Sequence, residues 1–153
     1  MKTMLAALAM SLGAGTAFAQ TGSACLFTPA ELDATLGHTP EAGVNDKDRL
    51  GTSSCRYAMK GARRIHFSVR IVTKCDEKRF EQHARTMESI SGKANKPLGG
   101  IGDGAYFSPG GTAAARVGAQ CIQFSGLNAG AKRAVGEVDA GKLLALGASR
   151  LGK

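Results

Sequence analysis

The stretch IHFSVRI, from Ile65 to Ile71, alternates apolar and polar residues along its whole length. Because successive side chains of a β-strand point to opposite faces, this alternation predicts a strand with one buried and one exposed face. Four further stretches are also strand candidates, and glycine-containing turns separate the last three of them. We expect these strands at residues 55–59, 105–107, 113–117 and 121–127, the last three as an antiparallel meander.

Three helices are predicted around the strands. Thr28 and Glu31 have the spacing of a capping box, and Pro29 suits the first helical position. This helix should end after Leu36 at Gly37, a residue that readily adopts the left-handed conformation of a C-cap. Amphipathic periodicity predicts two further helices, at residues 76–90 and 139–151.

The order of these elements favours an α+β fold. We expect an antiparallel sheet of about five strands, covered on one face by two or three helices and joined by two disulfides. A chain of 153 residues has room for one domain, here residues 25–153, and a hydrophobic content of 43% excludes a disordered chain.

The N-terminus has the pattern of a signal peptide. A positive start at Lys2 precedes an apolar stretch that ends in Ala17-Phe18-Ala19, so cleavage is predicted after Ala19. The apolar stretch is shorter than the roughly 20 residues that a membrane-spanning helix needs. Lipidation at Cys25 is disfavoured because residues 20–24, which are polar or small, separate it from that stretch. We therefore predict a signal peptide at 1–19, a flexible lead at 20–24 and a periplasmic or secreted protein with no transmembrane segment in the mature chain.

Four cysteines remain in the mature chain, at positions 25, 55, 75 and 121. An even number in an oxidising compartment predicts two disulfides, while zinc is disfavoured because no C-x-x-C pair is present. Three pairings are open. The order along the chain favours Cys25 with Cys55 and Cys75 with Cys121, which would leave no thiol as a nucleophile.

The charge balance is basic. The chain has 20 Lys and Arg against 12 Asp and Glu, and removal of residues 1–19 lowers the formal charge from +8 to +7. Such a surface favours contact with anionic lipid, polysaccharide or nucleic acid, although a net charge also serves solubility alone. Tyr106 and Phe107 are too few to form a stacking platform, so no specific nucleic-acid binding is expected.

Three ligand-binding motifs are present only in part. Residues 136–143 match a phosphate-binding loop in spacing, but Leu143 replaces its Ser or Thr. Residues 100–105 have the glycine spacing of a dinucleotide site but precede a predicted strand instead of a helix. Residues 46–57 resemble a calcium loop that has Leu50 and Tyr57 at ligand positions. We therefore expect no metal, no cofactor and no catalytic residues.

The polar face of the long strand is the candidate ligand-binding surface. By the two-residue period Arg64, His66 and Arg70 point the same way, and Arg116 on a later strand could join them to hold an anion. A polar face is also what an exposed antiparallel sheet normally has. His83 lies on the apolar side of its helix, where we expect a packed imidazole.

Three segments together resemble a known family: residues 24–32 followed by Leu36-Gly37, then Cys55-Arg56-Tyr57, and then residues 97–107. They are similar to the small exported bacterial domains of the DUF3558 type, common among actinobacterial lipoproteins and loosely similar to PsbP-like α+β folds. The resemblance implies a pairing of Cys25 with Cys55. The chain departs from the family by lacking a lipobox and by having Cys75 and Cys121, so surface anchoring and mechanism do not carry over.

From these patterns we expect a non-enzymatic exported binding module. The sequence does not identify its ligand, but the basic surface favours an anionic one. The alternative is a protein-interaction partner in the cell envelope, such as an immunity or inhibitor protein. A hydrolase would need a nucleophile and a base in one cleft, and the sequence offers only scattered Ser and His residues.

Overall fold

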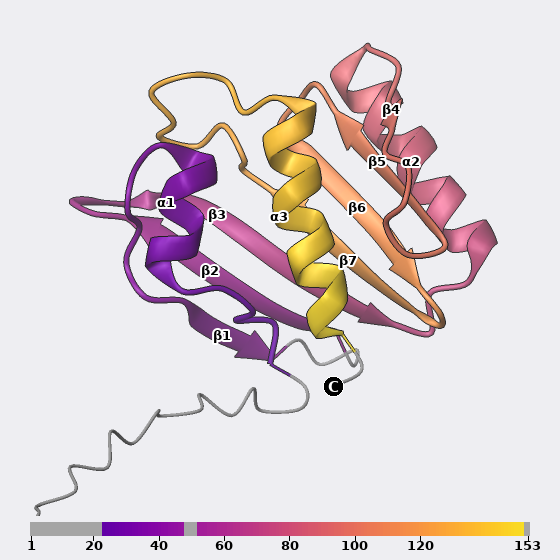
Figure 1. Ribbon diagram of the computed structural model, residues 1–153, viewed down its shortest axis with the longest axis horizontal. Helices are drawn as coiled ribbons and strands as arrows, with labels where there is room; N and C mark the ends of the chain where they lie inside the picture. The colour runs from indigo at the N-terminus through magenta and orange to yellow at the C-terminus, as the bar shows by residue number, and fades with distance from the viewer. Residues whose placement is uncertain (1–22, 48–51, 152–153) are drawn as a thin grey trace, which may run out of the picture.

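The computed structural model describes residues 23–47 and 52–151, which form a seven-stranded antiparallel sheet with three helices (Figure 1). The strands are β1 (Val44–Lys47), β2 (Ser53–Met59), β3 (Ala62–Thr73), β4 (Lys96–Pro97), β5 (Gly104–Ser108), β6 (Thr112–Val117) and β7 (Gln120–Ser125). Their order across the sheet is β1-β2-β3-β7-β6-β5-β4. The predicted α+β class with an antiparallel sheet is thus confirmed.

Two meanders meet along one seam in the middle of the sheet. Strands β1, β2 and β3 follow one another, and the chain then crosses to the far edge before β5, β6 and β7 return toward β3. The seam pairs β3 with β7 from Ser68 opposite Ser125 to Thr73 opposite Gln120. The alternating stretch from Ile65 to Ile71 therefore lies in the central strand, as its pattern predicts.

The helices begin and end at the residues that cap them. Helix α1 (Pro29–Leu36) has the complete capping box of Thr28 and Glu31 and ends at Gly37 with φ of 70°. Helix α2 (Glu77–Ser91) is capped by the Asp76 side chain, and helix α3 (Glu137–Arg150) begins two residues before the predicted start. All three predicted helices are confirmed, with ends shifted by at most two residues.

The main core lies between one face of the sheet and helices α1 and α3, which cross the near side of the sheet in Figure 1. Phe67 and Phe124 from the seam pack there against Leu144 of α3 and Leu32 of α1. Helix α3 approaches the sheet closely at Gly147. Any larger residue there would place its Cβ only 2.6 Å from the Ile122 Cδ1 atom.

Helix α2 covers the other face of the sheet, so the prediction of helices on one face only is wrong. The ring of Tyr106 on β5 packs against Phe80 of α2, whereas its neighbour Phe107 belongs to the core under α3. Because neighbouring residues of a strand point to opposite faces, α2 and α3 lie on opposite sides of the sheet. None of the residues of α2 is fully buried, which distinguishes it from the other two helices.

The sheet has seven strands where about five were expected. The two additional strands, β1 and β4, are the edges of the sheet and fall in segments where no strand was expected. β1 has the sequence VNDK and β4 is the dipeptide Lys96-Pro97. Asn, Asp, Lys and Pro are poor strand formers, so these segments are extended because a neighbouring strand pairs with them.

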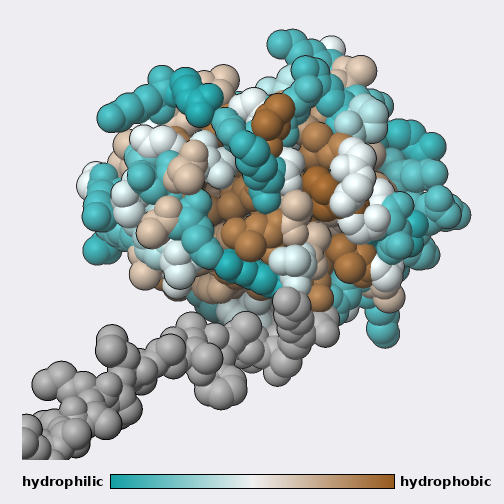
Figure 2. Space-filling view, viewed as in Figure 1, coloured by the Kyte–Doolittle hydropathy of each residue, from teal (hydrophilic) through white to brown (hydrophobic). Residues whose placement is uncertain are grey.

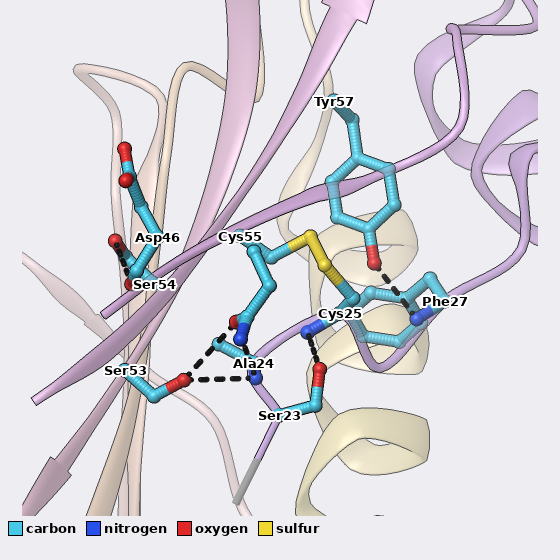
Figure 3. Close-up of a disulfide and its surroundings, with 10 residues drawn as sticks. Ser23, Ala24, Cys25, Phe27, Asp46, Ser53, Ser54, Cys55 and Tyr57 are labelled. Carbon is cyan, nitrogen blue, oxygen red and sulfur yellow. Dashed lines mark hydrogen bonds between the residues drawn. A yellow bond between two sulfur atoms is a disulfide. The ribbon is translucent and has the colours of Figure 1, made fainter. Parts of the chain in front are cut away.

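Two disulfides link Cys25 with Cys55 and Cys75 with Cys121, which confirms the pairing favoured by chain order (Figure 3 shows the first). The first disulfide ties the segment before α1 to β2. Beside it the Ala24 amide donates to the Ser53 hydroxyl at 3.1 Å, and Ala24 is fully buried. The packed domain thus reaches back to Ala24, one residue before the predicted boundary.

The predicted signal peptide at 1–19 lies outside the described residues. Within residues 23–47 and 52–151, no helix has the length and apolar character needed to cross a membrane.

An ion pair joins the two helices that cover the core. Arg150 near the end of α3 approaches the Glu31 carboxylate at 2.5 and 3.0 Å and also donates to the Leu26 carbonyl. The hydrogen bonds from Arg150 are the main cause that lowers the pKa of Glu31 to about 2. The same carboxylate accepts a hydrogen bond from the Thr28 amide. Glu31 therefore both caps α1 and binds Arg150 of α3.

Replacing both Cys25 and Cys55 by Ala should lower the free energy of unfolding by about 3–4 kcal/mol, because the 30-residue loop no longer constrains the unfolded chain. The double replacement of Cys75 and Cys121, which close 46 residues, should cost slightly more. Urea unfolding without reductant measures both values. A loss below about 1 kcal/mol in either variant would contradict the expected contribution of these disulfides.

Glu31→Gln should lower stability at neutral pH by about 2 kcal/mol, less than the full pKa shift would give, since the Arg150 and Glu31 side chains are 29% and 32% exposed. The folded pKa of Glu31 lies below its ordinary value of 4.5, so this contribution is present above that pH and is lost as the pH falls toward about 2. Urea unfolding across this range measures it. Arg150→Met, which leaves the capping box intact, should remove the same pH dependence; if it does not, the ion pair is not its source.

Candidate functional site

Helix α2 covers only one half of its side of the sheet. On β5 and β6 three of the side chains on the α2 side, those of Tyr106, Ser108 and Ala114, are buried. On β2, β3 and β7 the side chains pointing the same way are half-buried or exposed, except Cys121, which is buried in its disulfide with Cys75. We call this second half the open face, formed by Ser54, Arg56, His66, Ser68, Arg70, Gln123 and Ser125.

The strand register brings three basic side chains together on the open face. Ser68 on β3 pairs directly with Arg56 on β2, so His66 and Arg70 are the two diagonal neighbours of Arg56. Diagonal neighbours on one face lie roughly 7–8 Å apart, within reach of long side chains. The open face thus presents two guanidinium groups and an imidazole around one position.

An acidic residue of β1 contacts this group. The Asp46 carboxylate on β1 accepts a hydrogen bond from Arg56 at 2.9 Å, and both side chains are at least half exposed. From residue 53 to residue 75 the sequence has six Lys and Arg and no Asp or Glu. The charged side chains that β2 and β3 give to the open face are thus all basic, and the Asp46 carboxylate of β1 offsets part of their charge.

Helix α2 forms a wall beside the open face. Its far side is fixed by Asn95, whose side-chain amide donates to the Ala84 carbonyl at 2.8 Å and whose backbone N–H donates to the Glu88 carboxylate at 2.9 Å. Helical residues three and four apart share a side, and the side of α2 away from Asn95 runs through His83. That side carries Arg79, His83, Thr86 and Ile90.

His83 is the residue through which the wall contacts the sheet. Its Nδ1 atom is hydrogen-bonded to the Tyr106 hydroxyl, and the two rings lie 6.0 Å apart. Burial, and to a lesser extent the positive charge of Arg70, lowers the pKa of His83. Burial also raises the pKa of Tyr106. His83 is thus a packed, hydrogen-bonded imidazole, in agreement with the sequence analysis.

The structure does not bring all four predicted ligand-binding residues together. His66 and Arg70 share the open face. Arg64 lies where the β2–β3 register is irregular, since Ala58 pairs with His66 but Met59 pairs with Ala62, so the simple alternation fails there. Arg116 lies on β6 and pairs with Asp103 at 3.7 Å, with its side chain only 21% exposed. The register thus makes only His66 and Arg70 of the four close neighbours on the open face, and a ligand-binding role for any of the four stays a prediction.

Arg56 is the residue of this site that the sequence analysis missed. It alternates with Cys55 and Tyr57, which are buried, so its own strand pattern already directs it outward. What places it between His66 and Arg70 is the register of the β2–β3 hairpin. Counting residues back from the turn at Lys60-Gly61 gives the wrong partners, because the register shifts between Ala58 and Met59.

A cavity of about 260 Å³ lies on the opposite side of the sheet, between α3 and the segment that precedes β5. Figure 2 shows that this side is apolar over its middle and hydrophilic around its margin. The cavity is lined by Gly100, Ile101, Gly102, Val117, Ala145, Ala148 and Ser149. These residues carry no charge and no titratable group, so the cavity offers no acid–base chemistry.

The described residues also contain no thiol and no metal-binding group. All four cysteines form disulfides. Among residues 23–47 and 52–151, no three His, Cys, Asp or Glu side chains gather as a metal site would require.

Comparison with known protein families, with curated proteins and with solved structures finds no match. The resemblance to the DUF3558 type therefore stays a prediction.

Substituting Arg70→Gln should raise the pKa of His83, because a nearby positive charge no longer opposes its protonation. In the native protein the folded pKa lies below the ordinary 6.5, so the contribution of His83 to stability is present above that pH and is lost as the pH falls below it. NMR titration of the imidazole protons measures the shift, with His38 as the internal reference. If the pKa of His83 is unchanged by the substitution, Arg70 does not influence His83 and the prediction is wrong.

Proposed function

We propose that this protein is an exported, non-enzymatic module that binds an anionic partner through the open face. The observation that carries the proposal is that α2 leaves β2, β3 and β7 uncovered where Arg56, His66 and Arg70 are neighbours. Guanidinium groups hold carboxylate and phosphate oxygens through paired hydrogen bonds, and a flat sheet can present several of them to an extended ligand.

Export is supported by the disulfides and by the N-terminal pattern. Two disulfides in a domain of this size are typical of an oxidising compartment. The pattern that ends at Ala19 supplies the route to such a compartment. A periplasmic or secreted location after cleavage near Ala19 is therefore part of the proposal.

The histidine contacts support binding instead of catalysis. His38 Nδ1 donates to the Leu36 carbonyl, and His66 Nδ1 donates to the Arg64 carbonyl, both at 3.2 Å. His83 contacts Tyr106. None of these three contacts orients a histidine toward a serine or a thiol, as a nucleophile–base pair would need.

A protein partner in the cell envelope, as for an immunity or inhibitor protein, is the second candidate. It is favoured by the shape of the open face, where serine and glutamine side chains lie level with the basic ones across three strands. A partner protein with an acidic surface would use the same residues. The two candidates differ in whether a simple polyanion binds.

Arg56→Glu with Arg70→Glu should abolish binding of inorganic polyphosphate or poly-L-glutamate, and Arg70→Glu alone should weaken it roughly tenfold or more. Asp46→Asn should tighten binding by up to about fivefold, because Arg56 is released from its partner. Isothermal titration at low salt measures all three. Comparing the affinities for polyphosphate and for polyglutamate shows whether the site prefers phosphate or carboxylate groups.

The matched control for Arg70→Glu is Lys142→Glu, which makes the same change in net charge at an exposed residue of α3 on the other side of the sheet. It should leave binding nearly unchanged. An equal loss in this variant would show that net charge alone is responsible. If neither polyanion binds the native protein and an acidic envelope protein does, the second candidate replaces the first.

A further inference from the structure

The turn between β2 and β3 reaches past the rest of the sheet. β3 pairs with β7 only from Ser68 onward, whereas β2 and β3 continue together as far as Met59 opposite Ala62. We call residues 59–65 the hairpin arm. Its turn forms the left end of the described chain in Figure 1.

The exposed side chains of the hairpin arm are basic with one apolar exception. Lys60, Arg63 and Arg64 are exposed, and no ion pair to them is found among the described residues. Beside them Ile65 is 41% exposed, although isoleucine is among the residues most often buried. The arm thus combines unpaired positive charge with an exposed aliphatic side chain at a projecting tip.

A second segment supports the hairpin arm at its base and adds positive charge. A Cβ at Gly130 would lie 2.4 Å from the Met59 sulfur, and one at Gly126 would lie 2.4 Å from the His66 carbonyl oxygen. The loop that follows β7 is therefore seated against the arm. It carries the exposed residues Lys132 and Arg133, the latter paired with Asp139 at 3.1 Å.

The geometry points to docking of the hairpin arm on an anionic lipid bilayer, a contact separate from the open face. Lys and Arg side chains near an anionic membrane surface are attracted to it, while an aliphatic side chain among them can enter the apolar boundary below the headgroups. A soluble polyanion would satisfy the cations but would leave Ile65 in water. The exposed isoleucine is thus the observation that favours lipid.

The attraction should be additive and modest. Each cation at the membrane surface contributes about a fivefold increase in the binding constant at low salt. Three cations on the arm therefore give roughly a hundredfold preference for anionic over neutral bilayers. Because this attraction is screened, it should decline steeply as the salt concentration is raised.

The test is co-sedimentation of the mature protein, purified from the compartment to which it is exported, with vesicles of phosphatidylglycerol and phosphatidylcholine or of phosphatidylcholine alone. The native protein should bind the anionic vesicles only. Lys60→Glu combined with Arg63→Glu and Arg64→Glu should abolish binding. Ile65→Ser should weaken it severalfold without any change in charge. Thermal unfolding followed by circular dichroism verifies that each variant is folded.

The controls separate this inference from the proposed function. Arg56→Glu with Arg70→Glu should lose polyanion binding yet keep vesicle binding, whereas the hairpin-arm variants should do the reverse. Vesicle binding that survives the triple reversal at the arm would overturn the inference. If Ile65→Ser binds as the native protein does and polyphosphate displaces the vesicles completely, the arm is a general polyanion site and the lipid assignment is wrong.

Discussion

Four aromatic side chains join the two meanders of the sheet to the segment that leads into the first helix. The ring centroid of Phe67 on β3 lies 5.3 Å from that of Phe124 on β7 and 5.9 Å from that of Tyr57 on β2. Phe27 completes the ring of contacts, since it packs 5.7 Å from Phe124 and its amide donates to the Tyr57 hydroxyl at 2.9 Å. The buried hydroxyl is thus satisfied, and burial raises the pKa of Tyr57 to about 12.

Because this cluster and helices α1 and α3 bury one face of the sheet, the other face is left with a smaller structural role. Helix α2 attaches there through the second disulfide at Cys75, the Tyr106–His83 contact and the Asn95 hydrogen bonds, with no fully buried residue of its own. These attachments hold α2 over β5 and β6, so it leaves most of β2, β3 and β7 uncovered. The polar face available for binding is therefore a consequence of where the apolar side chains lie.

Local patterns predict the interior of this fold better than its edges. The capping box at Thr28 and the alternation around Phe67 depend on neighbours in sequence, and both are confirmed. Strand β1 depends on pairing with β2, and the grouping of Arg56 with His66 and Arg70 depends on register. Register and helix placement are long-range properties, so the sequence could indicate the polar strand face but not which residues meet on it.

Each disulfide joins cysteines that are consecutive along the chain. A polypeptide that enters an oxidising space N-terminus first presents Cys25 and Cys55 before either of the other two. The first bridge can therefore close while the C-terminal meander is still absent. The second must await β7, because Cys121 belongs to that strand. In this order of entry, the native partner of each cysteine is the cysteine next to it along the chain.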